Sequence, residues 1–250
     1  MTTPASKPER RGVARPRRAA GAATAPSPAV APVAAADRIG VTHLTAEYWP
    51  FARTGGLGEA VSGLATVQAA AGHPTTVIMP LYQLVRETTP SLERTGGGQA
   101  LVVTLGGHTE HAWLYEARAP GPGPRVYFIE HPDFFDRAGI YGDSGSDYPD
   151  NAQRFAFFCL AALTALPEIA PQTQLLHAHD WHTALAPVYL RTAFRGQPFH
   201  DRLATVLSVH NAGFQGHFPT ETVAQLGLAP ELYNPDVFEW YGRMNWLKGG

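Results

Sequence analysis

The sequence predicts an α/β domain built on a doubly wound parallel sheet. Short, β-branched apolar runs alternate along the chain with longer segments of helical spacing. Polar and glycine-rich stretches follow several of these runs, as is typical where a parallel strand ends and a helix begins. With 250 residues, the chain has room for one large domain or two modest ones, and it can bury a sizeable core.

The first predicted unit is a strand, a helix and a second strand. Residues 38–48 form a β-branched run, helical spacing extends from Val61 to a closing Gly72, and residues 75–80 are apolar again. A unit of roughly forty residues with this pattern is typical of two parallel strands joined by a crossover helix.

The later elements continue the alternation. Residues 99–130 predict three strands with short turns, which we expect to form a hairpin insertion. The segment 150–166 predicts a helix with one apolar face. The remaining expected elements are a strand over 174–180, a helix over 181–194 and a strand over 203–211.

Residues 1–37 are expected to form a disordered tail, because this Ala, Pro and Arg-rich stretch has few side chains to bury. The chain has 19 basic and 21 acidic residues, of which six basic and one acidic lie in 1–36. The remainder therefore has 13 basic and 20 acidic residues, a net charge of -7. An acidic folded part argues against nucleic acid as a partner.

The single cysteine, Cys159, excludes an intramolecular disulfide framework and favours a reducing compartment, the cytoplasm. Because it lies among apolar residues, we expect an inert core thiol. No stretch approaches the roughly 18–20 continuous apolar residues of a membrane helix, so no membrane association is expected.

The stretch "FARTGGLGEAV", residues 51–61, lies between the first strand and its helix. Backbone N–H groups of Gly55, Gly56 and Gly58, with the first turn of the helix, form a potential anion site. Arg53 adds a charge and a planar fork that suits phosphate oxygens. The alternative is a turn that uses glycine only for close packing.

A second cluster, "HAHDWHT" at 177–183, follows a predicted strand, where ligands bind in open α/β sheets. His177, His179 and His182 could hold a metal, because alternate residues of a strand share one face. In the alternative reading, Asp180 caps a helix and His177 is a packed core histidine.

Two polar loops complete the candidate site. In "SVHNAGFQGHFP" (208–219), His210, Asn211 and Gln215 suit sugar hydroxyls, and phenylalanines offer flat apolar faces. In "YGDSGSDYPDNAQRF" (141–155), Tyr148 and Asn151 could line the same cleft or merely form turns and a cap.

Together these stretches closely resemble the bacterial glycogen and plant starch synthases, which are retaining glycosyltransferases that use ADP-glucose. The resemblance covers residues 38–250 in order. It rests on the motifs "AEYWPFARTGGLGEAV" (46–61), "YPDNAQRF" (148–155), "HAHDWH" (177–182), "HNAGFQG" (210–216) and the Lys-Gly-Gly at 248–250.

The resemblance implies the first of two Rossmann-like domains of a GT-B glycosyltransferase, on the side of the α-1,4-glucan acceptor. By matching position, Gly55 and Gly56 would lie near the donor's diphosphate, and His182 or His179 would face the transferred glucose. Asn211 would contact the sugar. The other implied substrate-binding residues are Glu47, Arg53, Gly58, Glu59, Tyr148, Asn151, Asp180, His210 and Gln215.

Two positions depart from the family pattern: Arg53 stands where the family has lysine, and Glu59 stands where it has aspartate. These departures leave open whether the donor is ADP-glucose or UDP-glucose. The apolar segment before Gly250 predicts that the sequence is a fragment of a longer protein. The resemblance implies that the nucleotide domain would follow Gly250 and that this fragment is inactive alone. We expect no metal and no cofactor. The alternatives are a metal-dependent hydrolase that uses the histidine cluster and a non-catalytic glucan-binding module.

Overall fold

The computed structural model describes residues 31–118 and 123–250, and most of the predicted tail lies outside them. Of that predicted tail, the structure describes residues 31–37. A 3-10 helix spans Ala35–Asp37, and the backbone N–H of Val33 donates to the carbonyl of Ala71 at 2.8 Å.

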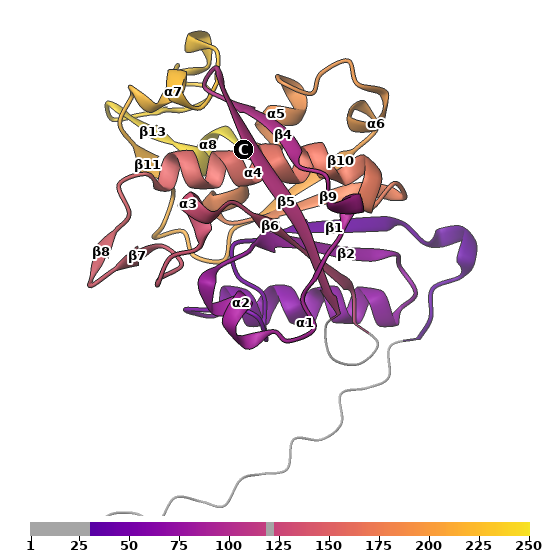
Figure 1. Ribbon diagram of the computed structural model, residues 1–250. Helices are drawn as coiled ribbons and strands as arrows, with labels where there is room; N and C mark the ends of the chain where they lie inside the picture. The colour runs from indigo at the N-terminus through magenta and orange to yellow at the C-terminus, as the bar shows by residue number, and fades with distance from the viewer. Residues whose placement is uncertain (1–30, 119–122) are drawn as a thin grey trace, which may run out of the picture.

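The centre of the fold is an eight-stranded mixed sheet in the order β10-β9-β1-β2-β6-β5-β3, with β4 paired to β5 (Figure 1). From β10 to β6 neighbouring strands are parallel. The strands of this sheet are β1 (Gly40–Leu44), β2 (Thr75–Pro80), β3 (Glu93–Arg94), β4 (Leu101–Leu105), β5 (His108–Arg118), β6 (Arg125–Glu130), β9 (Thr173–His179) and β10 (Ala204–Ser208).

The parallel strands have the doubly wound order, so the predicted fold class is confirmed. The chain runs outward from β1 through β2 to β6, and then returns to β9 on the other side of β1. Ligands bind at such a reversal, outside the carboxyl ends of the strands. The switch point between β1 and β9 is therefore where a site is expected.

The helices cover both faces of the sheet (Figure 1). α1 lies along one side of β1 and β2, and α4 lies on the other side. The helices are α1 (Leu57–Ala70), α2 (Gln83–Thr88), α3 (Pro132–Phe135), α4 (Asn151–Ile169), α5 (Leu185–Arg191), α6 (Pro198–Asp201), α7 (Thr222–Gln225) and α8 (Trp246–Gly249). Short 3-10 helices span Gly96–Gly98, Trp181–Thr183 and Pro230–Leu232, and small strands span Gly142–Asp143 (β7), Ser146–Asp147 (β8), His217–Phe218 (β11), Glu239–Trp240 (β12) and Arg243–Asn245 (β13).

The core is centred on α4, which is buried on nearly every side rather than on the one predicted face. Within 31–118 and 123–250, it is the one helix long and apolar enough to cross a membrane, but most of it is buried inside the protein. Pro167 has no N–H to give to the carbonyl of Leu163, and Nε2 of His200 lies 2.9 Å from that oxygen instead. Cys159 is buried in this helix, which raises the pKa of its thiol, as an inert core thiol requires.

Two predicted elements differ from the structure. The expected hairpin insertion over 99–130 includes β4 and β5, but β6 belongs to the parallel sheet, because it pairs with β2. The expected helix over 181–194 is divided into the 3-10 helix Trp181–Thr183 and α5. The division follows from Pro187, whose missing N–H cannot bond to the carbonyl of Thr183.

Candidate functional site

A cavity of about 540 Å³ lies beside the carboxyl ends of β1, β9 and β10. The loops that follow these three strands carry the glycine stretch, the histidine cluster and the asparagine loop, so the fold joins three motifs that are far apart in the sequence. The cavity is lined by Glu47, Thr54, Gly55, Gly56, Leu57, Ala60, Tyr141, Asp147, Asp180, Trp181, His182, His210, Asn211 and Phe214.

The amide groups of the glycine loop bond to a carboxylate of the protein itself. Oε2 of Glu47 accepts from the backbone N–H of Thr54 at 2.7 Å and of Gly55 at 3.3 Å. Its Oε1 accepts from the hydroxyls of Thr54 at 2.8 Å and Tyr141 at 2.6 Å. Burial raises the pKa of Tyr141 well above its usual value, so its hydroxyl stays protonated and donates. The backbone N–H groups of Thr54 and Gly55 thus already bind a carboxylate of the protein, that of Glu47.

The three glycines of this loop have two different roles. A Cβ on Gly55 or Gly56 would meet nothing within 4 Å, and both residues line the cavity. A Cβ on Gly58 would come within 3.1 Å of the Cβ of Arg53 and 3.2 Å of a backbone oxygen. Gly58 is therefore a packing glycine, as the alternative proposed, whereas the first two leave room for a ligand.

Arg53 and Glu59 lie outside the cavity lining. Their side chains form an ion pair, and both are largely exposed. The guanidinium of Arg53 also lies 4.4 Å from the ring centroid of Trp49. The predicted phosphate-binding charge is thus held at the surface beside the loop.

Asp180 orients the loop after β10 rather than capping a helix. Its carboxylate accepts from the backbone N–H of His210 at 2.6 Å and of Asn211 at 3.4 Å, and makes no cap bond. The residue has φ 56° and ψ -176°, a region that costs a non-glycine residue about 1–3 kcal/mol. The strained backbone lets one carboxylate both face the cavity and hold two cavity residues in place.

The imidazole of His182 is enclosed by aromatic rings. The centroid of its ring lies 4.6 Å from the ring centroid of Tyr141, 4.0 Å from that of Trp181 and 4.9 Å from that of Phe155. Burial, and secondarily the charge of Arg154, lowers its pKa to about 3, so the ring is neutral near pH 7. Its Nδ1 is buried with no hydrogen-bond partner in the described part of the chain. Because His182 lines the cavity, its neutral ring can form a hydrogen bond with a ligand there without carrying a charge.

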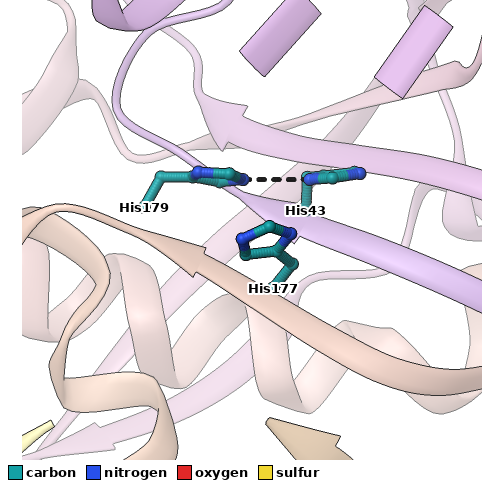
Figure 2. Close-up of side chains that lie close together, drawn as sticks. All are labelled: His43, His177 and His179. Carbon is teal, nitrogen blue, oxygen red and sulfur yellow. Dashed lines mark hydrogen bonds between the residues drawn. The ribbon is translucent and has the colours of Figure 1, made fainter. Parts of the chain in front are cut away.

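His179 lies behind the cavity and does not line it, contrary to the expectation that it could face the sugar. It groups with His43 and His177, and ligand atoms of the three rings lie within 4.8 Å of one another (Figure 2). Nε2 of His177 lies 2.7 Å from the hydroxyl of Ser208 and the residue is buried, so it is the packed core histidine of the alternative reading. Because His182 is not in this group, the three histidines of the alternative metal reading do not come together.

Three further candidates hold the loops in shape. The side chain of Asn151 donates to the carbonyl of Tyr141 at 2.8 Å, and the hydroxyl of Tyr148 accepts from the backbone of Gly139 at 3.2 Å. Gln215 accepts from Asn245 at 2.7 Å. None of the three lines the cavity. In this structure their side chains stabilise loops and do not contact this cavity.

Comparison with known proteins identifies the family. The family model of the starch synthase catalytic domain matches residues 40–250. The chain belongs to this family. Relatives include a glycogen synthase of Syntrophotalea carbinolica, 43% identical over 82% of this chain and 41% of its own length. Glycogen synthase 2 of Geobacter sulfurreducens is 39% identical over 84% of this chain and 42% of its own length.

A solved structure has the same architecture. The catalytic domain of starch synthase IV from Arabidopsis thaliana, bound to ADP and acarbose, is similar with a TM-score of 0.71 and 27% identity. The match covers 85% of this chain and 43% of that chain. This chain thus spans about two fifths of the length of its relatives in the starch synthase catalytic domain family. The hydrolase alternative has no support from these comparisons.

Sequence reasoning missed several lining residues of this starch synthase-type site. Trp181 lies between Asp180 and His182, two candidate residues, and this position in the sequence could have indicated that it lines the cavity. Thr54, Leu57 and Ala60 flank the glycines and follow once the helix start at Leu57 is known. Tyr141 begins the polar loop 141–155, but its own role had no local signal, because its hydrogen bond to Glu47 joins residues 94 positions apart.

Proposed function

We propose that this chain takes part in glucosyl transfer from ADP-glucose to the non-reducing end of an α-1,4-glucan. In this proposal residues 38–250 form the acceptor-side, Rossmann-like domain of a two-domain enzyme. The observation that carries the proposal is the single cavity in which glycine-loop, histidine-cluster and asparagine-loop residues meet. Membership of the starch synthase catalytic domain family supports it.

On the donor side, the diphosphate would lie against Gly55 and Gly56. The absence of Cβ atoms lets a ligand approach this backbone closely, and the N-terminus of the 14-residue α1 adds a partial positive charge. Loss of a diphosphate requires stabilisation of charge on the departing oxygens. No Lys or Arg is among the described residues that line the cavity. We therefore assign the stabilising positive charge to Arg53. Its guanidinium would leave Glu59 and bind the phosphate oxygens of the donor.

On the sugar side, His182 and Asn211 would hold the transferred glucose by hydrogen bonds to its hydroxyls. The anomeric carbon becomes cation-like during transfer, and a neutral imidazole adds no opposing charge beside it. Trp181 and Phe214 offer apolar faces for the carbon faces of sugar rings. Positioning of both substrates lowers the barrier, because it converts a bimolecular step into a unimolecular one.

The test is incorporation of labelled glucose into glycogen by the full product of the gene that encodes this chain. Incorporation from ADP-glucose, lost on His182→Ala in a protein that remains folded, is the expected result. No incorporation from either ADP-glucose or UDP-glucose by the folded protein would refute the proposal. Glycogen binding without any turnover would instead identify a glucan-binding module. We place the reaction in the cytoplasm, in keeping with a single, buried cysteine.

A further inference from the structure

A continuous line of hydrogen-bonded side chains leads from the cavity to the far part of α1. Nε2 of His210 lies 3.0 Å from Nδ1 of His179. Nε2 of His179 lies 2.9 Å from Nδ1 of His43 (Figure 2). Nε2 of His43 lies 2.7 Å from Oε1 of Gln68. Gln68 is eleven residues beyond the start of α1, about 16 Å along the helix axis.

The strand register brings the buried members of this line together. His43 of β1 is the register partner of His177 in β9, and His179 lies two residues further along β9, on the same face. His43 and His179 are fully buried. Gln68 is half-buried on α1, which covers this face, and His210 is exposed at the cavity.

The amide oxygen of Gln68 sets the direction of every bond in the line. A carbonyl oxygen accepts only, so Nε2 of His43 carries its proton and Nδ1 accepts. Nε2 of His179 therefore donates to His43, and Nδ1 of His179 accepts from Nε2 of His210. Burial holds the pKa of His43 at about 4 and lowers the pKa of His179 further below its usual value, so each carries one ring proton near pH 7.

We propose that Gln68 is a positioning residue that acts through His43 and His179 to fix His210 as the tautomer protonated at Nε2. The other nitrogen of His210, Nδ1, then faces ligands of the cavity as a hydrogen-bond acceptor. In the glucosyl transfer proposed above, on which this last step rests, the acceptor nitrogen receives a hydrogen bond from a sugar hydroxyl. The tautomer itself does not depend on which ligand binds.

The same nitrogens argue against a metal site at these histidines. Five of the six ring nitrogens of His43, His177 and His179 already bond to protein groups. A metal bound there would displace the protons that join the line. Metal binding and the hydrogen-bonded line are therefore mutually exclusive, which adds a second way to overturn the proposal.

The experiment reverses the donor–acceptor direction of these hydrogen bonds by substitution of Gln68, at the end of the line farthest from the cavity. Two-bond ¹H–¹⁵N spectra of the 250-residue chain report which nitrogen of each histidine is protonated, and loss of a signal in His210→Asn assigns His210. The expected wild-type result is the Nε2–H tautomer at His210. Gln68→Glu keeps an acceptor and keeps this tautomer. Gln68→Lys offers only a donor, so His210 shifts to the Nδ1–H tautomer.

The control is Gln83→Lys, because Gln83 is half-buried on α2, as Gln68 is on α1, and its side chain donates to Glu87; it should leave the His210 signals unchanged. An unchanged tautomer in Gln68→Lys, or stoichiometric zinc on the wild-type histidines, would overturn the proposal. In the transfer assay Gln68→Lys should raise KM for a sugar substrate about fivefold, the loss of one net hydrogen bond. If Gln68→Lys reverses the His210 tautomer but leaves KM unchanged, the proposed line of hydrogen bonds is supported. The proposed contact between His210 and a sugar hydroxyl is then refuted.

Discussion

The hydroxyl of Tyr141 donates to Oε1 of Glu47 at 2.6 Å and thereby joins the loop before α4 to the glycine loop after β1. Glu47 is nearly fully buried, so each bond to its carboxylate offsets part of the cost of burying a charge. The shape of the cavity beside the glycine loop thus depends on a residue of another loop.

Removal of that hydroxyl tests this dependence. We expect Tyr141→Phe to lower the free energy of unfolding by about 1–3 kcal/mol, because the bond is made to a charged group. Donor affinity should fall as the glycine loop loses one restraint. Urea unfolding and donor titration measure the two effects, and the effect of Tyr141→Phe should shrink in a Glu47→Gln background. Equal effects in both backgrounds would mean that the two side chains are not coupled.

The glycine loop offers a matched pair of alanine substitutions. Gly58→Ala should lower stability by about 1–3 kcal/mol, because its methyl group would press against Arg53 and a backbone oxygen. Gly55→Ala should keep or raise stability by up to about 1 kcal/mol, because its Cβ meets open space. We expect donor affinity to fall for Gly55→Ala. Normal donor binding by folded Gly55→Ala would show that no ligand approaches this backbone.

The surface pair of Arg53 and Glu59 predicts substitutions of opposite sign. Arg53→Ala should change stability by less than about 1 kcal/mol, because the pair is exposed, yet weaken donor binding roughly tenfold. Glu59→Gln should strengthen donor binding, since it frees the guanidinium. Calorimetric titration with ADP-glucose checks both. Weakening by both variants would indicate that the ion pair itself, rather than the free Arg53, serves the donor.

Buried neutral histidines predict a loss of stability in acid. The pKa values of His43 and His182 are lowered to about 4 and about 3, whereas both are near 6.5 in the unfolded chain. The unfolded chain therefore takes up protons first as the pH falls below about 6.5, and folding loses free energy until the folded-state pKa is reached. Between pH 7 and 5 each such histidine contributes about 2 kcal/mol of loss.

Urea unfolding at the two pH values measures this loss. His43→Asn should reduce the difference between pH 7 and 5 by about 2 kcal/mol. The same substitution at exposed His108 is the control and should leave the difference as in the wild type. An unaltered difference in His43→Asn would mean that His43 titrates alike in the folded and unfolded chain.

Local patterns predicted the elements that local chemistry determines. The apolar run 75–80 is β2 to the residue, because prolines bound it and both faces of the strand are buried. Gly72 ends the first helix region with φ 95°, as a closing glycine should. Pro187 carried the signal for the division of the 181–194 helix, and that signal was overlooked.

What remained hidden depends on partners distant in sequence. Nothing local shows whether β6 belongs to a hairpin or lies parallel to β2, because an apolar, β-branched strand fits either position. The motifs identified the loops that form the cavity, but not which side chains face it. Glu47 bonding to the glycine loop and His179 lying behind His210 became evident only when β1, β9 and β10 were aligned.

The placement of β1 beside β9 has a consequence for biosynthesis. β1 leaves the ribosome long before its second neighbour, β9, which begins only at Thr173. Until β9 has been made, one edge of this apolar strand has no neighbouring strand, and His43 has no imidazole beside it. The cavity consequently cannot form before β9 and β10 have been made, and nascent chains halted before β9 should be captured by chaperones.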